Sequence, residues 1–258
     1  MISLSRVGSS CETANVVEKL VLNPSDPLSY RRSPRATVRC LVHLKLSSSH
    51  QPERATRRWG IKLLFVCTAG RCRSPIAAAL LEKRLGPVDT GLSIASVGLK
   101  FTGKPTPEIG VSVMAERGID LAPHRSVAVT SETVADADVI LGMTREHVRD
   151  VVGISPAAWP KTFTLKDFVR RADKVGQPRR HQRLTDWLES VGEGRDPRDV
   201  LGADPDDEVP DPYGQRAKVW ERVVDELDDL VSMIPRLLGF TARSAPSADP
   251  ATRSRRSG

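Results

Sequence analysis

The stretch LLFVCTAGRCRSPIAAALLEK (residues 63–83) places two cysteines in a tight turn between two apolar segments. The apolar run over residues 61–66 predicts a short buried strand. Ser74 before Pro75, with Gly86 further on, is typical of a helix cap, a first helical turn and a helix end. We therefore expect a helix over residues 75–85, capped by Ser74, and a turn that joins a strand to its start.

This turn has the composition of an anion-binding loop. Backbone N–H groups at a helix start lack intrahelical partners, and the helix dipole adds partial positive charge there. Arg73 can bind two oxygens of a phosphate group. The donors that hold an anion also favour a thiolate at Cys67, and a thiolate is a nucleophile toward phosphorus. Ser74 is close enough in sequence to donate a hydrogen bond to that sulfur.

A second motif, VPDPYGQRAK (residues 209–218), offers the acid that a phosphate ester's leaving oxygen needs. Flanking prolines stiffen the backbone around Asp211 and can aim its carboxylate. Asp204, Asp206 and Asp207 lie on the same acidic run, and the Pro-Tyr-Gly context favours Asp211 over them.

The remaining pattern alternates strands with helices. We expect further strands at residues 92–98, 138–143 and 161–165, and helices at residues 108–117, 145–152 and 215–238, the last bent or ended by Pro235. This alternation predicts a parallel sheet covered on both faces. The charged residues 170–209 are interpreted as an insertion over the body, with a helix at 181–191.

Charge and composition limit the function classes. The net charge of the 258 residues is +7, but residues 1–59 carry +6, residues 241–258 carry +3 and residues 60–240 carry −2. A basic nucleic-acid face on the body is therefore not expected. We interpret residues 60–240 as the catalytic domain, residues 1–59 as a disordered basic extension and residues 241–258 as a disordered tail.

The apolar runs and the four cysteines indicate the compartment and the need for cofactors. No apolar run approaches the ~18 residues that cross a bilayer, so we expect no membrane insertion. The N-terminal residues make a poor secretory signal. The four cysteines do not form a disulfide scaffold or a zinc pattern, which predicts reduced thiols, a cytoplasmic location and no metal or other cofactor.

The two motifs in this order resemble the low-molecular-weight protein tyrosine phosphatase family. Residues 95–98 (ASVG) and 103–126 (GKPTPEIGVSVMAERGIDLAPHRS) are similar to its next segments, and the resemblance covers residues 60–240. It implies an α/β fold with a four-stranded parallel sheet and helices on both faces. It also implies hydrolysis of phosphotyrosine in a protein substrate through a cysteinyl-phosphate intermediate, without metal.

The resemblance also implies roles for single residues. Cys67 corresponds to the nucleophile, Arg73 to the phosphate clamp and Asp211 to the general acid and base. His124 corresponds to a histidine that supports the loop from behind, and Cys72 to a cysteine that can form a protective disulfide with the nucleophile. The substrate and its phosphate would contact Thr68, Ala69, Gly70, Arg71, Cys72, Ser74 and Tyr213, with Tyr213 as an aromatic wall.

Two departures leave alternatives open. The family's Gly-Asn reads Ala69-Gly70 here, so the left-handed conformation is accessible to Gly70, but the bracing bonds of the asparagine are lost. Arg71 is a cation at the pocket mouth that either favours substrates with acidic neighbours or points to solvent. His147 and His181 show no ligand spacing and are expected to be solvated.

Three other functions compete with a tyrosine phosphatase. An arsenate reductase of the thioredoxin-coupled kind needs a further cysteine, and none follows Cys72, but a reductase using a small external thiol remains open. Phosphoarginine is an alternative substrate. A phospho-binding module with weak or no turnover is suggested by the altered loop.

Overall fold

A four-stranded parallel sheet lies at the centre of the residues that the computed structural model describes, 60–87 and 91–240. Its strands are β1 (Ile61–Cys67), β2 (Leu92–Gly98), β3 (Val139–Gly142) and β4 (Thr162–Thr164), in the order β2-β1-β3-β4. All three strand pairs are parallel. The predicted fold class is confirmed, and β2 has the predicted bounds.

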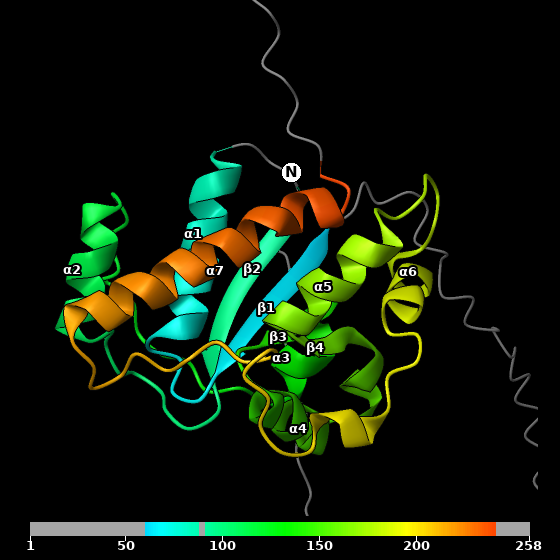
Figure 1. The fold of residues 1–258 in the computed structure, drawn as a ribbon, viewed down its shortest axis with the longest axis horizontal. Coiled ribbons are helices and arrows are strands. Elements are labelled where there is room, and N and C mark those ends of the chain that lie inside the picture. Colours follow the sequence, from blue (N-terminus) through cyan, green and yellow to red (C-terminus); the bar gives the residue numbers. More distant parts are fainter. Residues whose placement is uncertain (1–59, 88–90, 241–258) are drawn as a thin grey trace, which may run out of the picture. The chain divides into compact units, whose positions relative to one another are not determined.

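Helices cover both faces of the sheet. The side chains of β1 point alternately to one face and to the other, and both sets are apolar. Leu63, Phe65 and Cys67 belong to the larger of two apolar clusters, and Leu64 and Val66 belong to the smaller. The larger cluster includes residues of α1 (Arg73–Leu85), α2 (Glu108–Glu116), α5 (Leu165–Val175), α6 (Leu184–Val191) and α7 (Ala217–Leu237). The smaller includes residues of α3 (Ser131–Asp136), α4 (Arg145–Ile154) and the 3-10 helix η1 (Pro156–Lys161). Figure 1 shows α7 crossing the sheet beside α1 and α5.

The start of α1 differs from the prediction. The helix begins at Arg73, its N-cap is Cys72, and Ser74 lies within the first turn. Ser74 is fully buried, and its hydroxyl donates to the Val97 carbonyl oxygen at 3.2 Å and lies 3.1 Å from the Cys67 sulfur. The expectation that Ser74 caps the helix was wrong because its side chain bonds to β1 and β2 instead.

Two helices were not predicted, and the bounds of two others differ from the prediction. The helices α3 and α5 were not predicted, although Thr130 and Thr164 cap them with their side chains. The helix expected at 181–191 begins at Leu184 because His181 has a φ of 69°, outside the helical region. The helix α7 continues to Leu237, two residues past Pro235, because Leu237 is buried in the core.

The segment 170–209 stays a predicted insertion, and its first residues lie within α5. It also contains α6 and the short 3-10 helix η2 (Pro197–Val200). Trp187 of α6 is buried, meets Phe168 edge to face and donates to the Gly176 carbonyl oxygen at 2.8 Å. The interpretations of residues 1–59 and 241–258 lie outside the described residues. Within the described part, no helix has the length and apolar character needed to span a membrane.

Two glycines allow the loop after β1 to lie directly against the end of β2. Gly70 has a φ of 63°, the left-handed conformation expected for it. A Cβ atom on Gly98 would lie 2.4 Å from the Gly70 nitrogen and 2.5 Å from the Ala69 carbonyl carbon. Because both neighbours are backbone atoms, neither can move aside alone. Gly98 therefore fixes how closely the loop packs on the sheet.

We expect Gly98→Ala to destabilise the protein by roughly 1–3 kcal/mol, the usual cost of an inserted methyl group in a packed site. Gly153→Ala in α4 is the control, since a Cβ there meets nothing within 4 Å, and it should be neutral or stabilise by up to about 1 kcal/mol. Urea unfolding of both variants measures the difference. Equal stabilities would contradict the close contact.

Candidate active site

The Cys67 thiol lies at the carboxyl end of β1 and at the start of the loop. Its sulfur accepts a hydrogen bond from the Gly70 N–H at 3.2 Å and lies 3.1 Å from the Ser74 hydroxyl oxygen. The residue is 2% exposed. Two polar neighbours and the start of α1 therefore surround one buried sulfur.

The Arg73 guanidinium is buried beside the loop, although it opens α1. Its Nη1 donates to the Val209 carbonyl oxygen at 3.2 Å, and its Nη2 donates to the Thr68 hydroxyl at 3.3 Å. The Nε of Arg73 is buried and has no hydrogen-bond partner among the described residues. A buried donor without an acceptor is costly, so this N–H is available to a bound anion.

The carboxylate of Asp211 reaches this same arginine. Its Oδ2 lies 2.7 Å from Arg73 Nη2, and its Oδ1 accepts from the Tyr213 N–H at 3.1 Å. Two of its competitors on the acidic run, Asp204 and Asp207, both bind Arg145 instead. The structure thus brings Asp211 into contact with the loop arginine, across 138 positions of sequence.

His147 was expected to be solvated, and this was wrong. It is 1% exposed, and its Nε2 lies 2.9 Å from the Thr68 hydroxyl oxygen. Burial lowers the pKa of His147 to about 3, helped by the charges of Arg73 and Lys100, so the ring is neutral near pH 7. Its Nδ1 accepts from the Thr144 N–H at 3.1 Å, which leaves the ring proton on Nε2 to donate to Thr68.

His147 was missed because its spacing was tested only for metal ligation. The signal was local: Thr144 follows β3 and stands three residues before His147, the spacing of a capping box. The box closes the start of α4 and turns the imidazole toward the loop.

The second histidine of the site supports the opposite part of the loop. The Nε2 of His124 lies 2.7 Å from the Gly70 carbonyl oxygen. Ala69 and Gly70 are the positions where the resemblance leads one to expect Gly-Asn, and Gly70 takes the left-handed conformation there. Gly70 is therefore held by two hydrogen bonds: its carbonyl oxygen accepts from His124, and its N–H donates to the Cys67 sulfur.

The remaining loop residues separate into a half-buried rim and a buried floor. Arg71 donates through Nε to the Pro105 carbonyl oxygen at 2.7 Å, and its guanidinium lies 5.5 Å from the centroid of the Tyr213 ring. Cys72 is buried and free, and burial, with the charges of Asp211 and Cys67, raises the pKa of its thiol to about 12. Cys72 is thus a neutral thiol near pH 7.

An ionic cluster holds the segment that precedes Asp211. Asp207 accepts from Arg145 at 2.6 Å and from Arg170 at 2.8 Å. Burial alone would raise the pKa of Asp207, but the hydrogen bonds from Arg170 and Arg145 outweigh it and hold that pKa below its ordinary value. The Val209 N–H then bonds to the Met143 carbonyl oxygen at 2.8 Å. The segment is therefore attached to α4, to α5 and to the end of β3.

Arg195 attaches residues 170–209 to the sheet. Its guanidinium lies 4.1 Å from the Trp159 ring centroid and 4.0 Å from that of Phe163, and it donates to the Thr162 carbonyl oxygen at 2.7 Å. Burial lowers the pKa of Arg195 to about 10, so it remains a cation near pH 7.

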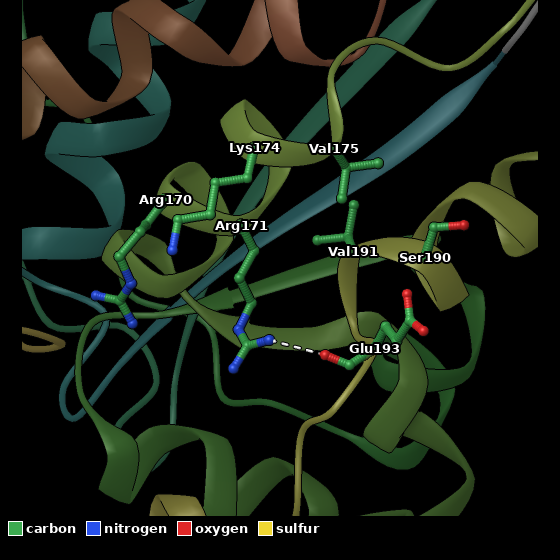
Figure 2. A pocket seen from close by; sticks show the side chains of 7 residues that line it. All are labelled: Arg170, Arg171, Lys174, Val175, Ser190, Val191 and Glu193. Atoms are coloured by element: carbon green, nitrogen blue, oxygen red, sulfur yellow. Dashed lines mark hydrogen bonds between the residues drawn. The ribbon is translucent and has the colours of Figure 1, made fainter.

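A hollow of about 380 Å³ lies between α5 and α6, away from the loop. Figure 2 shows its lining, with Arg171 Nη1 donating to the Glu193 carbonyl oxygen at 3.1 Å. Arg170 and Arg171 both also bind Asp167. None of its lining residues belongs to the loop or to the Asp211 segment, so the hollow is separate from the surroundings of Cys67.

A thiol at the carboxyl edge of a parallel sheet, beside a buried arginine with an unpaired N–H, suits nucleophilic attack on a bound phosphate group, the chemistry of a cysteine-dependent phosphatase. Comparison with known proteins agrees with this class. Residues 62–189 match the family model described as low molecular weight phosphotyrosine protein phosphatase, a match that includes the loop and stops before Asp211.

The match spans most of the length of each relative. The chain is 32% identical over 178 residues to a protein-arginine-phosphatase of Geobacillus stearothermophilus, covering 69% of this chain and 95% of that protein. It is 30% identical over 167 residues to the low molecular weight protein-tyrosine-phosphatase Etp of Escherichia coli K12, covering 64% and 86%. The solved YwlE arginine phosphatase from G. stearothermophilus superposes with a TM-score of 0.50 at 32% identity, covering 67% and 90%. The chain belongs to the low molecular weight phosphotyrosine protein phosphatase family, and it is a phosphatase.

The pair of Arg73 with Asp211 predicts competition with phosphate. We expect Asp211→Ala to bind inorganic phosphate about three- to tenfold more tightly, because a competing carboxylate is removed from Arg73. Titration calorimetry with phosphate measures this, and Asp206→Asn is the matched control on the same run. Unchanged or weaker binding by the alanine variant would show that the ion pair does not oppose phosphate.

The ionic cluster predicts a pH-dependent stability. Asp207→Asn should lower the free energy of unfolding by about 3 kcal/mol near pH 7, as expected when one partner of a mostly buried pair is lost. Because the folded pKa of Asp207 is depressed, its contribution is present above the ordinary value of about 3.9 and is lost as the pH falls through the folded value.

Urea unfolding of the wild type and of Asp207→Asn at pH 7 and near pH 3 tests this. The difference between the two should shrink at the lower pH, whereas Asp206→Asn should differ little from the wild type at either. A difference that grows on acidification would reverse the expected sign.

Proposed function

We propose that the protein hydrolyses phosphotyrosine in proteins through a cysteinyl-phosphate intermediate on Cys67. The observation that carries the proposal is the buried sulfur with the Gly70 N–H at 3.2 Å and the Ser74 hydroxyl at 3.1 Å. Buried sulfur flanked by these donors, with a buried arginine in the same loop, suits attack on a phosphate group.

In the first step, the Cys67 thiolate attacks phosphorus and an S–P bond forms as the P–O bond to the tyrosine breaks. Protonated Asp211 gives its proton to the departing phenolate oxygen. The phosphate oxygens take the place of Asp211 on Arg73 and also meet the unpaired Nε of that arginine. This exchange frees the carboxyl group for the leaving oxygen.

In the second step, water attacks the phosphocysteine. Asp211 accepts a proton from the water, an O–P bond forms, and the S–P bond breaks to release inorganic phosphate and the thiolate. The Ser74 hydroxyl has one proton and two neighbours, the Val97 carbonyl oxygen and the Cys67 sulfur. Turning that proton from the carbonyl to the sulfur stabilises the leaving thiolate. These protein groups supply the nucleophile, the charge and the proton, so the steps use no metal.

Phosphoarginine is the second candidate substrate, because a relative with 32% identity is named a protein-arginine-phosphatase. The same groups would serve, with Asp211 protonating the departing guanidine nitrogen. We place phosphotyrosine first because the Arg71 guanidinium beside Tyr213 disfavours a cationic leaving group.

We also place the protein in the cytoplasm, since the mechanism needs the Cys67 thiol to stay reduced, and Cys67 and Cys72 are free.

The mechanism predicts activity on p-nitrophenyl phosphate in the presence of EDTA. Cys67→Ser should abolish it, and Asp211→Asn should lower kcat by roughly 10²–10⁴, the usual contribution of a positioned acid. Rapid acid quenching of the enzyme with ³²P-labelled substrate should trap label on Cys67. Full activity in Cys67→Ser would overturn the mechanism.

The substrate is tested separately. A phosphotyrosine peptide, a phosphoarginine peptide and arsenate with glutathione are compared under the same conditions. We expect the highest kcat/KM for the phosphotyrosine peptide; a preference for phosphoarginine would replace the proposed substrate while leaving the mechanism intact.

A further inference from the structure

Arg71 places a fixed positive charge at the rim of the loop. Its Nε donates to the Pro105 carbonyl oxygen, and its guanidinium lies 5.5 Å from the ring of Tyr213, which is 59% exposed. One backbone carbonyl and one aromatic ring therefore hold the cation at the surface. It is not directed freely into solvent, which was one of the two orientations left open by the sequence.

The charge of Arg71 has no carboxylate partner in the described part of the chain. In contrast, Asp211 compensates the neighbouring Arg73, and Asp207 compensates Arg145. Lys100 also contacts the loop, but through its backbone: its main-chain N–H donates to the Thr68 carbonyl oxygen at 3.0 Å. Its charge is also close enough to help lower the pKa of His147, which touches the loop.

We infer that Arg71 is a specificity-determining residue that selects phosphotyrosine flanked by aspartate or glutamate. This inference rests on the proposed function, since it assigns a substrate class to the same site. A peptide whose phosphotyrosine enters the loop has its neighbouring side chains at the rim. Acidic side chains there meet the charge of Arg71, which no described carboxylate compensates, whereas lysine or arginine side chains are repelled.

The test uses three peptides that differ only in the residues beside phosphotyrosine, which are glutamate, glutamine or lysine. We expect the kcat/KM of the wild type to fall in that order at low salt, by about three- to fivefold per step, the size of a rim-exposed ion pair. Raising the ionic strength to about 0.5 M should compress the ranking, because exposed charges are screened.

Three variants assign the ranking to the charge of Arg71. Arg71→Met keeps an unbranched side chain but removes its charge and should flatten the ranking, whereas Arg71→Lys should keep it. Arg183→Gln is the matched control, an exposed arginine that pairs with Asp186 at the start of α6, and it should rank the peptides as the wild type does. The inference is wrong if the wild type does not discriminate or if Arg71→Met discriminates equally well.

Binding separates this inference from the proposed function. The same three peptides are titrated into Cys67→Ser and into the double variant Cys67→Ser/Arg71→Met by fluorescence anisotropy. If the wild type hydrolyses none of the peptides, the proposed function fails, and the binding order alone decides the role of Arg71. A glutamate preference that disappears with Arg71→Met supports the inference, and one that persists or never exists overturns it.

Discussion

The buried guanidinium of Arg73 is the charge around which the rest of the site is arranged. It is 4% exposed, and a charge removed from water must find compensating partners. Those partners come from separate parts of the chain: the Thr68 hydroxyl in the loop, the Val209 carbonyl oxygen and the carboxylate of Asp211. The need to compensate this one cation thus brings together the loop and the segment that carries Val209 and Asp211. A phosphate dianion would compensate the same cation.

Three residues at the end of β3 complete the arrangement from the other side. Thr144 caps α4, Arg145 binds Asp207 and His147 bonds to Thr68. The connection from β3 to α4 therefore holds two parts of the site. Arg145 holds the segment that precedes Asp211, and His147 holds the loop after β1. Because the sheet is parallel, this connection lies at the same edge as the end of β1.

The strands, helices and sheet type could be predicted from the sequence more reliably than the individual side-chain contacts. Strand–helix alternation predicted the parallel sheet, and the strand-turn-helix around Cys67 predicted where the loop lies. The Pro-Tyr-Gly neighbours favoured Asp211 among four aspartates, and this choice stays a prediction, whereas its ion pair with Arg73 spans 138 positions and has no local signal. The burial of His147 was missed for a related reason, since it depends on packing that no short segment encodes. For Ser74 the predicted contact with the Cys67 sulfur is present, and only the helix-cap assignment was wrong.

The 138 positions between Arg73 and Asp211 also bear on how the protein is made. A ribosome releases the loop and its cysteine long before the acid segment and α7, which packs along α1. Contacts between such distant segments form late, after a large loop-closure cost has been met. A nascent chain thus exposes Cys67 and Arg73 well before Asp211 has been made, and the two parts can meet only once the segment up to Asp211 has left the ribosome.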